Sequence, residues 1–147
     1  MLDRLSLARG FSGKALENYL LRFQFQNAKT DDLWEELGAA AGIDVKYIMD
    51  TWTLQMGYPV VHVSRDPADP SRGVARQGRF LLSPDSDTAD DKFTSPYNYT
   101  WFVPLDYITS SSPTTATQIY MNLTTEIIFS WPTLTGSSSI RGFSDTI

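Results

Sequence analysis

Cysteine is absent from this chain of 147 residues, and histidine occurs only once. The lack of cysteine excludes disulfide bonds and thiolate metal sites, but it leaves the cellular compartment undetermined. Basic residues are also scarce, 12 against 17 acidic ones, so the net charge is −5. Because phosphate neutralisation dominates the affinity of proteins for nucleic acids, this charge balance argues against a nucleic-acid partner.

Long apolar runs are missing as well. No run reaches the roughly 18 residues expected of a transmembrane helix, and the N-terminus carries no signal-peptide pattern. The chain as given is therefore predicted to contain no membrane-spanning segment. Hydrophobic residues make up 41% of the chain and aromatic residues 13%, which is enough for a real core in one domain or in two small ones.

The first third of the chain has helical periodicity. Apolar residues spaced three and four apart predict helices over residues 13–25, 30–41 and 45–56. The expected caps are Ser12, Thr30, Asp31, Asp32 and Asp44 at the N-termini, and Gly42 and Gly57 at the C-termini. The expected buried residues are Leu16, Tyr19, Leu20, Phe23, Leu33, Trp34, Leu37, Ala41, Val45, Ile48, Met49, Trp52 and Met56. An earlier helix is expected to end near Leu5.

From Tyr58 onward, short runs rich in β-branched and aromatic residues alternate with polar loops. They predict strands near residues 58–64, 75–82, 97–104, 117–122 and 125–131. No helical pattern separates these runs, so an antiparallel β-sandwich is favoured over a parallel sheet.

The predicted fold class is therefore α+β, with two parts. A short segment of three to four helices, residues 1–57, is followed by an incomplete antiparallel β-sandwich domain, residues 58–147. Within the second part, residues 134–147 are rich in serine and glycine and are expected to be disordered.

The single histidine, His62, is the first candidate for chemistry. A helix-borne zinc hydrolase needs two histidines one helical turn apart with a glutamate between them. A Ser-His-Asp hydrolase would have to use His62 too, and no G-x-S-x-G motif presents a nucleophile. Because His62 alternates with Val61 and Val63 in an expected strand, we interpret it as a structural strand residue.

Two clusters each have two interpretations. The acidic cluster forms either a calcium site or a solvated loop, and Ala89 at a ligand position favours the solvated loop. Its members are Asp85, Asp87, Asp90 and Asp91. The aromatic cluster forms either a ligand platform or the core side of a strand, and its alternation favours the core. Its members are Tyr97, Tyr99, Trp101 and Phe102.

Two sequons offer candidate modification sites. Asn98 and Asn122 each begin an N-x-T triplet, which would accept a glycan in a secretory setting. Such triplets also arise by chance, and Asn98 lies between aromatic residues, where a structural asparagine is an equal alternative.

Four stretches of the sequence together resemble one enzyme family. They are NAKTDDLWEEL, VKYIMDTWTLQMGYPVV, RFLLSP and SPYNYTWFVPLDYITS. In this order they resemble the zinc metallo-aminopeptidases of the gluzincin type, the family of aminopeptidase N and glutamyl aminopeptidase. The resemblance spans residues 1–110, where a thermolysin-like catalytic domain passes into a β-sandwich domain. The stretch from Met49 to Pro59 resembles the junction between these domains, and the resemblance is lost after Thr109.

The resemblance implies a parent enzyme that removes N-terminal residues from peptides with a zinc ion held by two histidines and a glutamate. No position here matches H-E-x-x-H or the G-x-M-E-N loop of the family, and we expect both upstream of Met1. No catalytic, metal-binding or substrate-binding residue is therefore assigned, and the chain is expected to hold no cofactor. The resulting hypothesis is an inactive fragment of a zinc aminopeptidase. The alternative is a stand-alone interaction module or a truncated isoform.

The resemblance also suggests partners and a location. The expected partners are the rest of the parent chain and the peptide substrates of the parent, with no nucleic acid. The quoted stretches are most similar to the membrane-anchored, outward-facing members of the family. They imply the extracellular face of the plasma membrane or the secretory pathway, with a cytosolic parent as the alternative.

Overall fold

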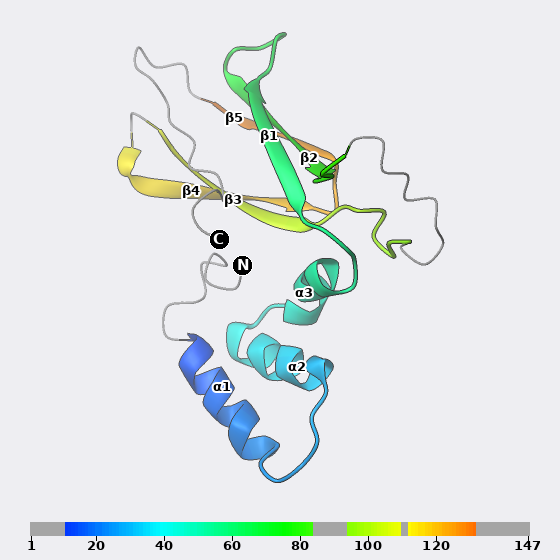
Figure 1. Ribbon diagram of the computed structural model, residues 1–147. Coiled ribbons are helices and arrows are strands. Elements are labelled where there is room, and N and C mark those ends of the chain that lie inside the picture. Colours follow the sequence, from blue (N-terminus) through cyan, green and yellow to red (C-terminus); the bar gives the residue numbers. More distant parts are fainter. Residues whose placement is uncertain (1–10, 84–93, 110–111, 132–147) are drawn as a thin grey trace. The chain divides into compact units, whose positions relative to one another are not determined.

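The computed structural model describes residues 11–83, 94–109 and 112–131 (Figure 1). The chain divides into two compact units, Met1–Thr53 and Leu54–Ile147. Described helices occur in the first unit and described strands in the second, which confirms the α+β class. The acidic cluster and the tail 134–147 lie outside the described residues.

Unit 1 contains α1 (Phe11–Arg22), α2 (Thr30–Ala41) and α3 (Val45–Thr53). Its buried core is formed by Ala15, Trp34, Leu37 and Val45, with Leu33, Ala41, Ile43 and Met49 packed against them. Two predicted caps are confirmed. Gly42 ends α2 in the left-handed conformation at φ 67°, and the Asp44 carboxylate accepts a 2.9 Å hydrogen bond from the backbone N–H of Tyr47.

The buried face of α1 differs from the prediction. Leu16 and Leu20 are 47% and 59% exposed, whereas Ala15 is completely buried. The inward side is formed by Ala15 in the core, with Tyr19 and Phe23 half-buried at four-residue spacing. Ser12 is not the N-cap, since the helix already begins at Phe11.

Helix α3 is shorter than predicted. It ends at Thr53, so Met56 lies outside the helix and is 52% exposed, and Trp52 is only partly buried. The hydroxyls of Thr51 and Thr53 donate to the carbonyls of Ile48 and Met49 at 2.8 and 3.0 Å. Such bonding within a helix, together with β-branching, weakens its continuation.

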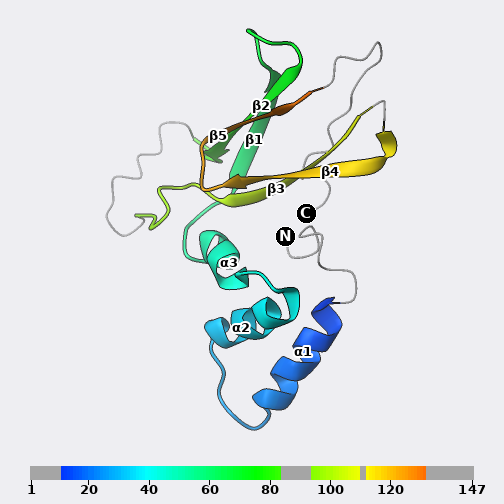
Figure 2. The same ribbon diagram turned by 180° about the vertical axis from the view of Figure 1, so that it is seen from behind.

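Unit 2 consists of two antiparallel sheets. Strands β1 (Pro59–Arg65), β2 (Arg72–Arg79) and β5 (Glu126–Ser130) form one sheet in the order β1-β2-β5. Strands β3 (Phe102–Thr109) and β4 (Ser112–Asn122) form the other. The first sheet lies against the β3–β4 pair in both views (Figures 1 and 2), and the rings of Tyr107 and Phe129 join them at 5.2 Å. The buried apolar residues of this unit are Val74, Ala75, Trp101, Val103, Leu105 and Met121.

The predicted strand over residues 97–104 is wrong in its first half. Residues 97–100 form a turn, in which Asn98 and Tyr99 both have φ 52°, and β3 begins only at Phe102. The hydroxyl of Ser95 accepts hydrogen bonds from the backbone N–H groups of Tyr97 and Tyr99, both at 3.0 Å. Asparagine tolerates the left-handed region, and this local bonding outweighs the strand preference of the aromatic residues.

One buried side chain links the two sheets of unit 2. Gln77 of β2 is 8% exposed, and its Oε1 accepts from the backbone N–H of Trp101 at 2.9 Å. Its Nε2 donates to the carbonyls of Trp101 and Thr124 at 3.0 and 2.6 Å. The amide thus connects β2 to the start of β3 and to the turn between β4 and β5.

Gly73 of β2 provides a first test of the packing. A Cβ at this position would lie 2.5 Å from Cζ of Phe129 and 2.7 Å from Cε3 of Trp131, two rings that cannot both retreat. We expect Gly73→Ala to lower the free energy of unfolding by about 1–3 kcal/mol in denaturant titrations. Gly78→Ala on the same strand is the matched control, because nothing lies within 4 Å of its Cβ. Equal stabilities of the two variants would contradict the packing.

Gln77 provides a second test. In Gln77→Leu the volume is nearly preserved, but the N–H of Trp101 and two carbonyls lose their partner. We expect a loss of at least about 2 kcal/mol in the free energy of unfolding, the cost of buried unsatisfied groups. Gln118→Leu is the control, since the Gln118 amide bonds the side chains of Asp106 and Tyr120 in the β3–β4 sheet, where Tyr120 is exposed. A difference within error between these variants would show that the Gln77 amide is dispensable.

Candidate functional site

His62 lies on an exposed position of β1, in line with its interpretation as a strand residue. Its neighbour across the sheet is Arg76 of β2, which forms an ion pair with Glu126 of β5. Among the described residues, no three His, Cys, Asp or Glu side chains come together to hold a metal ion. The described residues therefore do not fit a hydrolytic zinc site, which needs three protein ligands.

The aromatic cluster is divided by the turn at 97–100. Trp101 is completely buried, and Phe102 packs on Tyr120 with ring centroids 5.4 Å apart. Tyr99 lies under the guanidinium of Arg79 at 3.9 Å. The core interpretation is confirmed for Trp101, but the regular alternation of a strand is absent because Tyr97 and Tyr99 belong to the turn.

The two sequon asparagines lie at the same end of unit 2. Asn98 is exposed in the turn that precedes β3, and Asn122 is exposed as the last residue of β4. They are brought near each other because Phe102, at the start of β3, is the register partner of Asn122.

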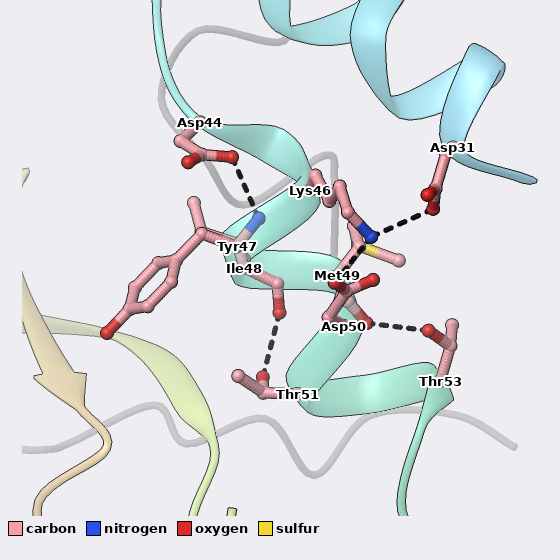
Figure 3. Close-up of polar contacts among 9 residues, drawn as sticks. All are labelled: Asp31, Asp44, Lys46, Tyr47, Ile48, Met49, Asp50, Thr51 and Thr53. Carbon is pink, nitrogen blue, oxygen red and sulfur yellow. Dashed lines mark hydrogen bonds and ion pairs between the residues drawn. The ribbon is translucent and has the colours of Figure 1, made fainter. Parts of the chain in front are cut away.

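A cluster of charges that the sequence did not reveal joins α2 to α3 (Figure 3). The ammonium group of Lys46 donates to Asp31 at 2.8 Å and to Asp50 at 2.7 Å. These hydrogen bonds raise the pKa of Lys46 well above its ordinary value, and the one donated to Asp31 has the larger effect. The i, i+4 spacing of Lys46 and Asp50 was the available signal. The contact with Asp31 required the tertiary fold.

In the described residues, each pKa shift is in the direction that favours the charged form of the group. The hydrogen bond that Arg22 donates to Glu36 raises the pKa of Arg22, and hydrogen bonds from Ser71 lower the pKa of Asp69. A general acid or base needs a pKa near the working pH, so Lys, Arg and Asp shifted in these directions are unsuited to proton transfer. These groups, like the neutral amide of Gln77, hold elements of the fold together.

The first part of the chain matches a protein-family model. Residues 1–52 match the peptidase family M1 domain. Glutamyl aminopeptidase of Sus scrofa is 40% identical over 101 residues, which is 69% of this chain and 10% of that protein. Glutamyl aminopeptidase of Mus musculus is 46% identical over 92 residues, 63% of this chain and 9% of that protein.

A third relative has a different name. Puromycin-sensitive aminopeptidase of Caenorhabditis elegans is 42% identical over 101 residues, 68% of this chain and 10% of that protein. The chain thus spans about a tenth of the length of the curated relatives that it matches. With a family match over its helices and aminopeptidase relatives at this identity, the chain belongs to the peptidase M1 family of aminopeptidases.

Proposed function

We propose that this chain is the segment of a zinc-dependent aminopeptidase that joins the last helices of the catalytic domain to the β-sandwich domain. The parent would remove N-terminal residues from peptides, and its remaining chain would be the main partner of this segment. On this proposal, residues 1–57 are catalytic-domain helices and residues 58–147 are sandwich.

The extent of the similarity carries the proposal. A stretch of 101 aligned residues is longer than unit 1, which ends at Thr53, and longer than the 94 residues from Leu54 to Ile147. It therefore spans the junction between the units. The family model ends at residue 52, next to the same boundary.

The exposed apolar side chains of unit 1 also support a larger parent. Leu16, Leu20 and Leu21 of α1 are 47%, 59% and 57% exposed. A helix face with three exposed leucines is typical of a surface that another part of a protein covers. The exposed leucines are equally consistent with a stand-alone interaction module that binds a partner through them, which is the competing proposal.

The role proposed for these 147 residues is structural, not catalytic. Lys46 and Arg76 are held in ion pairs, and the register partner of His62 across the sheet is Arg76. Zinc in the parent would activate water for peptide hydrolysis, with its ligands supplied by other parts of the parent. No helix within the described residues is long and apolar enough to cross a bilayer.

Metal content and activity test this proposal directly. We expect the purified chain to bind no stoichiometric zinc by elemental analysis and to leave alanyl, leucyl and glutamyl anilides intact, because no three metal-ligating side chains come together in the described part of the chain. The glutamyl anilide is included because relatives are named glutamyl aminopeptidase. His62→Ala is the control variant. If one zinc per chain appeared with a chelator-sensitive rate that His62→Ala abolished, the chain would be an enzyme in its own right.

We also propose that the parent is made in the secretory pathway and carries glycans at Asn98 and Asn122, both of which are exposed. Expressed through that pathway, the chain should show two glycan-sized mobility steps that a glycosidase removes. Asn98→Asp and Asn122→Asp should each remove one step, and aspartate at 98 still tolerates the left-handed turn. A mobility unaffected by either variant would favour a cytosolic parent.

A further inference from the structure

The irregular segment Leu54–Gly57 connects α3 to β1 and belongs to unit 2. Leu54 and Met56 are 55% and 52% exposed, and no regular hydrogen-bond ladder includes them. Such a segment would ordinarily be a flexible linker. The two residues that alternate with these, Gln55 and Gly57, are held by unit 2.

Gln55 bonds both ends of the turn at 95–100. Its Nε2 donates to the carbonyl of Thr100 at 2.8 Å, and its Oε1 accepts from the hydroxyl of Ser95. The same Ser95 oxygen accepts from the backbone N–H groups of Tyr97 and Tyr99. One donated and two accepted bonds use the full capacity of this hydroxyl. The segment and the turn therefore share one hydrogen-bond network, although about 40 residues separate them in sequence.

Gly57 provides a second connection to the same turn. It has φ 90°, and a Cβ there would lie 3.2 Å from Nε of Arg79. The Arg79 guanidinium in turn stacks on the ring of Tyr99 at 3.9 Å. Its Nε and Nη1 are buried without a hydrogen-bond partner among the described residues, so the face of the ring is its main electrostatic contact there. Glycine thus permits the backbone to approach this stacked pair closely.

We propose that the turn at 95–100, together with Gln55 and Arg79, forms a clamp that fixes Leu54–Gly57 to unit 2. Any movement between the two units then pivots at Thr53–Leu54, where α3 ends, and not along the connecting segment. Gln55 and Arg79 are positioning residues for the direction in which the chain leaves unit 2. This inference depends only on contacts inside unit 2 and stands or falls independently of aminopeptidase activity in the parent.

Hydrogen exchange of the whole chain tests the clamp. In the wild type we expect the backbone N–H groups of residues 54–58 to be as protected as those of the turn at 95–100. Gln55→Ala should accelerate exchange in both segments by about tenfold, the effect of losing one or two ordinary hydrogen bonds. Residues 103–107 of β3 should be unaffected. Gln118→Ala, which removes the same groups from the β3–β4 sheet, should leave both segments unchanged.

Two further variants keep the test decisive. Tyr99→Asn removes the ring under Arg79 while retaining a residue that accepts φ 52°. It should accelerate hydrogen exchange in residues 54–58 as well as in the turn. If Gln55→Ala unfolds the whole unit, Gln55→Glu keeps the acceptor for Ser95 and loses only the donor to Thr100. Gln55→Glu should then accelerate hydrogen exchange in the same two segments to a smaller degree. The clamp would be overturned if the backbone N–H groups of residues 54–58 were unprotected in the wild type. It would also be overturned if a Gln55 variant accelerated exchange in this segment and left exchange in the turn unchanged.

Discussion

A buried amide must form all its hydrogen bonds, and this constraint organises unit 2. Gln77 is enclosed between the two sheets, and its side chain bonds three backbone groups of Trp101 and Thr124. Water cannot replace these partners in a packed interior, so the start of β3 and the β4–β5 turn are fixed relative to β2. The turn at 95–100 directly precedes Trp101, whose backbone N–H is bonded by Gln77.

Each unit is held by its own interactions. In unit 1, Trp34 and Leu37 of α2 pack against Ala15 and Val45, and Lys46 adds an exposed ion-pair link from α3 to Asp31. Exposed ion pairs contribute little to stability, so the apolar contacts carry most of the unit. The core is small, and the leucines of α1 remain outside it.

The charged side chains with shifted pKa values in the described residues take part in structural contacts. The shifted pKa values all favour the charged state, and the one histidine is exposed on a strand beside Arg76. In the family, hydrolysis requires a zinc ion with three protein ligands. Within unit 2, Gln55 bonds the carbonyl of Thr100 and Gly57 lies close to Arg79.

The sequence by itself determined the features that depend on neighbouring residues. The α+β class, the Asp44 and Gly42 caps and the burial of Trp34 all follow from periodicity and local backbone chemistry. Tertiary structure decided two other features. The inward side of α1 is formed by Ala15 and not by the leucines, and Gln77 bonds Trp101 and Thr124. These outcomes depend on groups 24 or more residues apart, or on which face meets a neighbouring element, and a pattern of nearby residues carries no information about either.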